Sequence, residues 1–190
     1  MDKILNTLIE TGAILEGHFL LTSGRHSNKY VEKFRLIENP QSLDLVCSAM
    51  ADMYSNKNIN LVLGAAIGGI LISGGVGKKL NVKHIFTERV NGIMELRRGF
   101  QIDQGSKVLI VEDIVTTGGS IFELIEVVNN NNGAIVGITS ILDRNQKPVD
   151  FGFPYKTLVQ YPVESWDDKN CPECLQNNPI IHPGRSGKKD

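Results

Sequence analysis

The sequence has almost no net charge. Lysine and arginine together number 20 and the two acids number 21, so the formal charge at pH 7 is −1. A protein that holds a nucleic-acid backbone usually carries a basic excess, and this chain has none. We therefore expect no nucleic-acid partner. A small anionic substrate is compatible with this composition, because its binding depends on where charges lie rather than on their total.

Long apolar runs are also missing. No run reaches the ~18 residues that cross a bilayer, and the acidic N-terminal stretch lacks the basic start and apolar core of a signal peptide. Cysteine is scarce, with three residues (Cys47, Cys171 and Cys174). An odd number suits a reducing cytoplasm better than a secreted disulfide framework. We predict a cytoplasmic protein with no membrane partner.

Two of the cysteines form half of a zinc-binding pattern, Cys171-Pro-Glu-Cys174. A structural zinc site needs four ligands, and the histidine nearest in sequence is His182. Two chains could supply four thiolates at a dimer contact. We favour a plain tail with free thiols over zinc.

The chain has 190 residues, which is enough for one compact domain with a small extension. In its middle, short apolar runs alternate with helical patterns, which is typical of a parallel sheet covered by helices on both faces. We predict strands over 61–65, 82–88, 106–113 and 134–144. Before them we predict a helix over 4–9, paired strands around a polar bend within 13–36, and a helix beginning at Asn39-Pro40.

Two further segments have distinct local signals. Asn91-Gly92 lies between two short alternating runs and predicts a hairpin turn, so we expect a two-stranded arm that projects from the sheet. The segment from Pro162 onward is rich in proline, asparagine, glycine and charge, which predicts a loosely packed tail.

Residues 108–120, VLIVEDIVTTGGS, carry the chemistry. The apolar strand directs two acids, Glu112 and Asp113, to the sheet edge where open α/β folds bind ligands. The TTGGS loop then leads into a helix, and its glycines, unpaired N–H groups and helix dipole favour a phosphate. Acids repel phosphate, so this pair should face sugar hydroxyls and a carbon that becomes cationic. The alternative is an ordinary strand-to-helix turn with a solvated acid pair.

This segment resembles the signature of type I phosphoribosyltransferases. Two other segments resemble orotate phosphoribosyltransferase in particular: FLLTSGRHSNKY (19–30) is similar to its N-terminal hood, and ILDR (141–144) to a strand that ends in a substrate arginine. FTERVNGIMELRRGFQI (86–102) is similar to the mobile arm of one subgroup. The resemblance implies a single α/β phosphoribosyltransferase domain over 1–165, with the hood at 12–38 and the mobile arm at 88–104, followed by a C-terminal tail over 166–190.

The resemblance also implies roles for individual residues. Glu112 and Asp113 would act in catalysis and hold the ribose hydroxyls of phosphoribosyl pyrophosphate. The residues expected to bind that substrate are Glu112, Asp113, Ile114, Val115, Thr116, Thr117, Gly118, Gly119, Ser120, Arg89, Arg97 and Arg98. Thr116 and Arg144 match positions that contact orotate, whose carboxylate an arginine can hold by two parallel hydrogen bonds.

The implied reaction is displacement of pyrophosphate from ribose C1 by a ring nitrogen of orotate, a step of UMP biosynthesis. Mg²⁺ would bridge pyrophosphate and ribose oxygens and keep its waters, so we expect no side chain to ligate a metal directly. The arm with Arg89, Arg97 and Arg98 would close over pyrophosphate and reach a neighbouring subunit of a homodimer.

The sequence also departs from the family pattern. The arm has neither lysine nor histidine, Thr22 stands where the hood usually has a lysine, and a second lysine is replaced near Gly68. For the arm arginines the alternative is a solvated hairpin face. For Gly68 and Gly69 it is the geometry of helix initiation. We expect His26 to be exposed rather than catalytic.

Two other functions compete. One is transfer to a purine or another pyrimidine, but Arg144 argues against it, because a neutral base has no carboxylate to pair with an arginine. That reading treats Arg144 as a ligand; the alternative is a surface arginine paired with Asp143 or Glu112. The other function is a regulator that binds phosphoribosyl pyrophosphate without catalysis, and the missing arm lysines keep it open.

Overall fold

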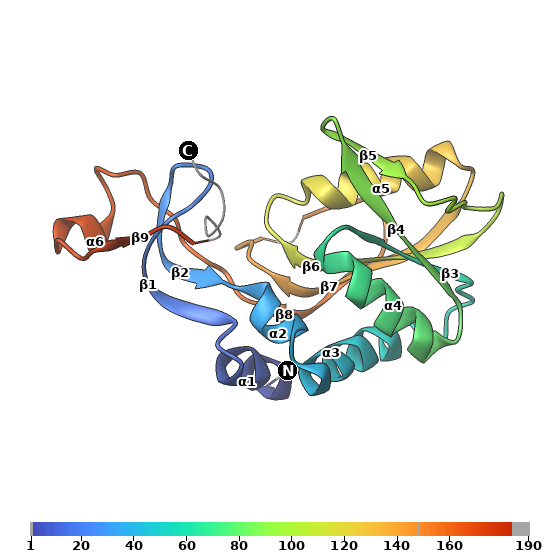
Figure 1. The fold of residues 1–190 in the computed structure, drawn as a ribbon, viewed down its shortest axis with the longest axis horizontal. Coiled ribbons are helices and arrows are strands. Elements are labelled where there is room, and N and C mark those ends of the chain that lie inside the picture. Colours follow the sequence, from blue (N-terminus) through green and yellow to red (C-terminus); the bar gives the residue numbers. More distant parts are fainter. Residues whose placement is uncertain (1, 148, 184–190) are drawn as a thin grey trace.

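A computed structural model describes residues 2–147 and 149–183 (Figure 1). Its centre is a six-stranded sheet in the order β5-β4-β3-β6-β7-β8, parallel except for the β4–β5 pair. The strands span β3 (Leu61–Ala65), β4 (Lys83–Val90), β5 (Ile93–Leu96), β6 (Lys107–Val115), β7 (Ala134–Asp143) and β8 (Tyr155–Gln160). The predicted α/β fold with a mostly parallel sheet is confirmed.

Alternate residues of the central strands enter two different cores. On β6, Val108 and Ile110 pack on one face of the sheet, whereas Leu109 and Val111 pack on the other. This follows from the two-residue period of a strand. Because both faces are covered, the strands read as continuous apolar runs. Helix α5 (Gly119–Asn130) covers the face with Val108 and Ile110, and helices α3 (Pro40–Asp52) and α4 (Gly68–Leu80) cover the face with Leu109 and Val111.

The direction of winding reverses between the two central strands. From β3 the chain passes through α4 to β4 on one side, and from β6 it passes through α5 to β7 on the other. At such a switch point the loops after the two strands diverge and leave a crevice at the carboxyl ends. The position of the crevice is therefore set by strand order.

The N-terminal part forms a separate small sheet beside the main one, here called the hood. After α1 (Asp2–Glu10), β1 (Ile14–Leu20) pairs with antiparallel β2 (His26–Val31), as predicted. A short helix, α2 (Lys33–Ile37), follows β2, and the side chain of Asn39 caps α3 through the N–H of Ser42. Figure 1 shows the hood to one side of the main sheet.

The hairpin turn is confirmed as well. Asn91 and Gly92 have φ values of 50° and 85°, and the left-handed conformation at both central positions is the one that tight hairpin turns require. The turn joins β4 to β5, which lies at the sheet edge. The arm therefore extends from the same end of the sheet as the crevice.

The tail is more ordered than its composition predicts. A short helix, α6 (Pro172–Leu175), and strand β9 (Ile180–Ile181) were missed, and β9 adds to the edge of β1 in the hood. The backbone of Trp166 exchanges two hydrogen bonds of 2.8 Å with His26. His26 is 3% exposed, so the expectation that it is exposed was wrong. In the described part of the chain, no helix has both the length and the apolar character to cross a membrane.

Candidate active site

Two buried carboxylates lie near the end of β6. Glu112 is 7% exposed and Asp113 4%. Each accepts a hydrogen bond from the next backbone N–H: that of Asp113 lies 2.9 Å from Glu112 Oε1, and that of Ile114 lies 2.6 Å from Asp113 Oδ1. The alternative of a solvated acid pair is thus wrong, because water reaches neither side chain freely.

The surroundings of the two acids compensate their negative charges to different extents. Burial raises the pKa of Glu112, and the neighbouring charge of Asp113 raises this pKa further. Asp113 has a cation of its own, since Nζ of Lys33 lies 2.7 Å from its Oδ2. One carboxylate is therefore neutralised by an ion pair, while the other is held at an energetic cost that a ligand donating hydrogen bonds would relieve.

A glycine within β3 and another after it make room for these groups. A Cβ atom on Gly68 would lie 1.8 Å from Oδ2 of Asp113, and one on Gly64 would lie 2.5 Å from the carbonyl oxygen of Gly69. Both distances are too short for a side chain, so the backbone of α4 approaches β3 and the acid pair closely. This close packing of helix and strand accounts for Gly68 and Gly69 without any ligand.

The TTGGS loop leaves the amino end of α5 open. Gly118 precedes the helix with φ 82°, and no side chain caps the first N–H groups. A cavity of about 250 Å³ lies over this end and is lined by the whole loop from Thr116 to Ser120 together with Arg89. Glu112 and Glu123 line the hollow too, and Glu123 pairs with Arg89, so the open N–H groups and hydroxyls are the features that suit a phosphate here.

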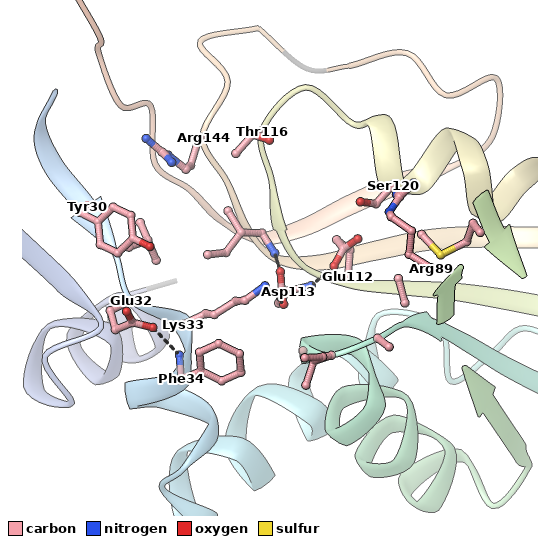
Figure 2. A pocket seen from close by; sticks show the side chains of 17 residues that line it. Tyr30, Glu32, Lys33, Phe34, Arg89, Glu112, Asp113, Thr116, Ser120 and Arg144 are labelled. Atoms are coloured by element: carbon pink, nitrogen blue, oxygen red, sulfur yellow. Dashed lines mark hydrogen bonds and ion pairs between the residues drawn. The ribbon is translucent and has the colours of Figure 1, made fainter. Parts of the chain in front are cut away.

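A larger cavity of about 550 Å³ separates the hood from the sheet edge (Figure 2). In Figure 2, Lys33 extends from the hood toward Asp113, while Arg89 and Ser120 lie beyond Glu112. Its polar and charged lining residues are Tyr30, Glu32, Lys33, Arg89, Glu112, Asp113, Thr116, Ser120 and Arg144. The acids thus lie between the phosphate loop and the hood.

Arg144 follows β7 and faces this cavity from the side of Thr116 (Figure 2). Its Nε is buried and has no hydrogen-bond partner within the described part of the chain. Burial lowers the pKa of its guanidinium. It also lines a third cavity, of about 530 Å³, together with Tyr30 and Thr116. The alternative of an ion pair with Asp143 or Glu112 is not found among the described residues.

The three arm arginines have different positions. Arg89 lines both the large cavity and the phosphate hollow and pairs with Glu123 of α5. Arg97 pairs with Glu95, and Arg98 pairs with Glu88 at 2.7 Å; neither lines the large cavity or the phosphate hollow. Their predicted binding of phosphoribosyl pyrophosphate stays a prediction.

Most of the predicted site is brought together by the fold. Ile114 lines both the large cavity and the phosphate hollow, and Val115 lines the hollow from a buried position. Sequence reasoning missed Lys33, which supplies a cation near the acids where the hood has no lysine at Thr22. In the sequence, Lys33 is marked only by its position at the start of a helix directly after the second hood strand. Its partner, Asp113, lies 80 residues further along the chain, so no local pattern connects the two.

Comparison with known proteins gives a consistent result. A family model described as a phosphoribosyl transferase domain matches residues 35–178. The chain is 42% identical over 187 residues to an orotate phosphoribosyltransferase of Caldicellulosiruptor bescii, covering 98% of each chain. It is 42% identical over 186 residues to another of Thermotoga maritima, covering 98% of this chain and 100% of that one.

Solved structures share the fold. An orotate phosphoribosyltransferase from Aeropyrum pernix matches with a TM-score of 0.72 at 23% identity, covering 83% of this chain and 93% of that chain. An adenine phosphoribosyltransferase from Rhodothermus marinus matches with a TM-score of 0.68 at 19% identity, covering 84% and 99%. The two enzymes are named for different bases, orotate and adenine, but their TM-scores are similar. The structural likeness therefore shows the fold and does not identify the base.

Proposed function

The chain belongs to the phosphoribosyl transferase family, and we propose that it transfers the phosphoribosyl group of phosphoribosyl pyrophosphate to orotate, giving orotidine 5′-monophosphate and pyrophosphate. The observation that carries this proposal is the buried acid pair between an open helix end and a half-buried arginine, Arg144, whose Nε has no partner among the described residues. Each of the three features suits a different part of the two substrates. The acids and Arg144 line the large cavity, and the loop borders it through Thr116 and Ser120.

The phosphate and ribose of the donor suit the loop and the acids. The N–H groups at the start of α5 and the hydroxyls of Thr116, Thr117 and Ser120 would hold the 5-phosphate. Glu112 and Asp113 would accept hydrogen bonds from the ribose hydroxyls, which a phosphate could not offer. The negative charge of the Asp113 carboxylate then stabilises positive charge that develops at C1 as the bond to pyrophosphate breaks.

Arg144 suits the carboxylate of orotate. The guanidinium is partly buried and keeps donors free, so it can form two parallel hydrogen bonds with a carboxylate and regain what burial costs it. Thr116 lies on the same side of the cavity (Figure 2). Holding the base there places its ring nitrogen against C1, so that a new bond forms as pyrophosphate leaves.

The pyrophosphate requires cations. Arg89 lines the cavity at the arm, and Lys33 stands at the hood side beside Asp113. The buried acids offer hard oxygen atoms that fit a divalent ion of the magnesium type, with ribose hydroxyls and waters between. When bound, Mg²⁺ would neutralise charge on the leaving pyrophosphate.

The first test of this function is direct. Pure protein is mixed with orotate, phosphoribosyl pyrophosphate and Mg²⁺, and loss of orotate absorbance is followed together with release of pyrophosphate. We expect steady loss that needs magnesium. Adenine, hypoxanthine and uracil serve as competing bases. Pyrophosphate release with one of these and not with orotate would contradict the assignment of the base, and binding of the donor without any turnover would point to a regulator.

We also propose a homodimer in which the arm reaches the partner's site. Arg97 and Arg98 do not line the large cavity of their own chain, and Ile93 at the arm tip is 64% exposed. The test mixes two inactive variants, Asp113→Asn and Arg97→Ala/Arg98→Ala, after dissociation and reassociation. If the arm acts across the dimer, the mixture should regain roughly a quarter of wild-type activity, because half of the dimers then hold one intact site. No recovery would place the arm in its own subunit's site.

A further inference from the structure

Four side chains from the hood and the tail meet at one point, away from the cavity just described. His18 lies on β1 and His26 begins β2, whereas Cys171 is the N-cap of α6 and Cys174 lies within that helix. Their ligand atoms all lie within 4.8 Å of one another. We call these four residues the hood–tail cluster.

The cluster is buried and closely spaced. His18 is 2% exposed, His26 3% and Cys171 0%. Sγ of Cys174 lies 3.5 Å from Nε2 of His18 and 3.3 Å from Nδ1 of His26, and Sγ of Cys171 lies 3.6 Å from Nε2 of His18. The cysteines are free thiols, so no disulfide accounts for this arrangement.

The outer nitrogen of each ring shows which inner nitrogen carries a lone pair. Nδ1 of His18 lies 2.9 Å from the backbone oxygen of Asn178, which can only accept a hydrogen bond. Nε2 of His26 lies 2.6 Å from the carboxylate of Asp168. Both outer nitrogens therefore donate a proton, and in neutral rings both inner nitrogens present lone pairs.

These two inner nitrogens face each other at 2.6 Å. Two lone pairs at that distance repel, so the site calls for a positive species between them. A single shared proton would form a hydrogen bond between the two nitrogens, but it would not explain why two thiols lie beside them. A metal ion would satisfy all four groups at once.

We propose that the hood–tail cluster binds one zinc ion through two thiolates and two imidazoles. Sulfur and nitrogen donors in fourfold coordination are the zinc ligands of structural sites, and four protein ligands leave no open position for catalysis. Distances of about 2.3 Å for Zn–S and 2.0 Å for Zn–N place tetrahedral ligands about 3.3–3.8 Å apart. The three sulfur–nitrogen distances fit that range, and the two nitrogens need to separate by somewhat under ~1 Å.

The surroundings support this assignment. The backbone N–H of Cys174 lies 3.4 Å from Sγ of Cys171, a contact that stabilises a thiolate within a Cys-x-x-Cys turn. The oxygen atoms of Asn178 and Asp168 orient the two imidazoles, as outer partners of metal-binding histidines do. The proposal is the alternative to a plain tail with free thiols, and the expectation that no side chain ligates Mg²⁺ directly stays a prediction.

The ion would fasten the tail to the hood. It joins positions 153 residues apart in the chain, so it closes a long loop of the unfolded state. His26 and Tyr30 lie on the same strand, and Tyr30 lines the large cavity. Zinc would therefore act as a positioning element for one wall of the cavity, with no part in the reaction.

The primary test is the metal content of the full-length protein, measured by mass spectrometry after growth with zinc. We expect about one zinc per chain in the wild type. The Cys171→Ser/Cys174→Ser variant should contain less than about a tenth of that amount. His182→Ala is the matched control, because His182 is the histidine nearest to the cysteines in sequence but lies outside the cluster. Equal loss of zinc in the control would overturn the ligand assignment.

A second measurement remains decisive if the double variant does not fold. The wild type is stripped with a chelator and refilled with Co²⁺. Tetrahedral coordination by two sulfurs and two nitrogens should give intense visible bands and a sulfur-to-cobalt charge-transfer band at one equivalent. A weak octahedral spectrum would overturn the proposal, as would a denatured, unreduced chain that shows one free thiol instead of three. Because no readout involves turnover, these outcomes are independent of the proposed enzymatic activity.

Discussion

The cavity at the sheet edge and the hood–tail cluster both bury ionisable side chains, but the two sites differ in what surrounds these side chains. In the cavity, Nε of Arg144 has no partner among the described residues, and Glu112 is buried beside a second acid. In the cluster, the ligand atoms of four side chains face one another within 4.8 Å. Groups left unsatisfied cost stability unless a ligand relieves them. The difference indicates that the cavity binds molecules that enter and leave, whereas the cluster binds something that stays.

The comparison gives a rule for variants. Changes in the cavity should reduce activity and leave stability nearly intact or even improved, because these residues are placed for substrates. Changes in the cluster should lower stability first. A variant that violates this rule would show that the two regions share a role.

The largest effect is expected for Asp113→Asn. Removing the charge should reduce kcat roughly 100- to 1,000-fold, because the carboxylate stabilises positive charge in the transition state. Thermal unfolding should change little, since Lys33 is partly exposed and can be solvated. Steady-state kinetics and a melting curve check this. Asp103→Asn, on an exposed residue, is the control. Equal losses of activity and stability would indicate a structural acid.

Removal of zinc should give the next largest effect, on stability. Chelation should lower the Tm by about 5–10 °C, which corresponds to roughly 2–4 kcal/mol for a chain of this size. The Cys171→Ser/Cys174→Ser variant should melt at the lower temperature and show no further shift with chelator. Added zinc should restore only the wild type. An unchanged Tm would mean that the cluster is held together without a metal.

A smaller effect is expected for Arg144→Ala. Loss of the charged hydrogen bonds should raise the KM for orotate about 10- to 100-fold, equivalent to roughly 1.5–3 kcal/mol. The KM for phosphoribosyl pyrophosphate should stay nearly constant, because the proposed binding residues of this donor are the acids and the loop. Arg35→Ala, at an exposed arginine that pairs with Glu38, serves as the control. A parallel rise of both constants would remove Arg144 from the base site.

The smallest effect concerns Glu112 and pH. Burial raises the pKa of Glu112 to about 8 in the folded chain, so the folded state retains a proton that the unfolded state releases at lower pH. Stability from this group is present below the unfolded pKa of about 4.5 and is lost as pH rises through the folded pKa. Glu112→Gln mimics the protonated form, so its stability relative to wild type should increase from pH 5 to pH 8.

We expect a gain of about 1–2 kcal/mol between these two pH values. Urea unfolding of both proteins at several pH values measures it. Glu126→Gln, at an exposed glutamate of α5, should show no such trend. A constant difference between Glu112→Gln and wild type at every pH would show that Glu112 is already charged at pH 5.

The central sheet and the phosphate loop could be predicted because their signals are local. Strand and helix periods, the cap at Asn39 and the turn at Asn91-Gly92 act within a few residues. The segments that were missed, α2, α6, β8 and β9, are short or lie in polar surroundings, where periodicity gives little signal. β9 in particular has two residues and exists only because β1 offers it an edge.

The sequence by itself determined the α/β fold and the acid-and-loop segment, since residues 108–120 are contiguous and backbone hydrogen bonding places them together. Only the tertiary structure decided that Lys33 pairs with Asp113, that Arg144 keeps a donor free, and which histidines meet the tail cysteines. His18 and Cys171 are 153 residues apart, and nothing in either local sequence refers to the other. Such contacts depend on strand order and on the docking of the tail, and these are settled by burial across the whole chain rather than by local periodicity.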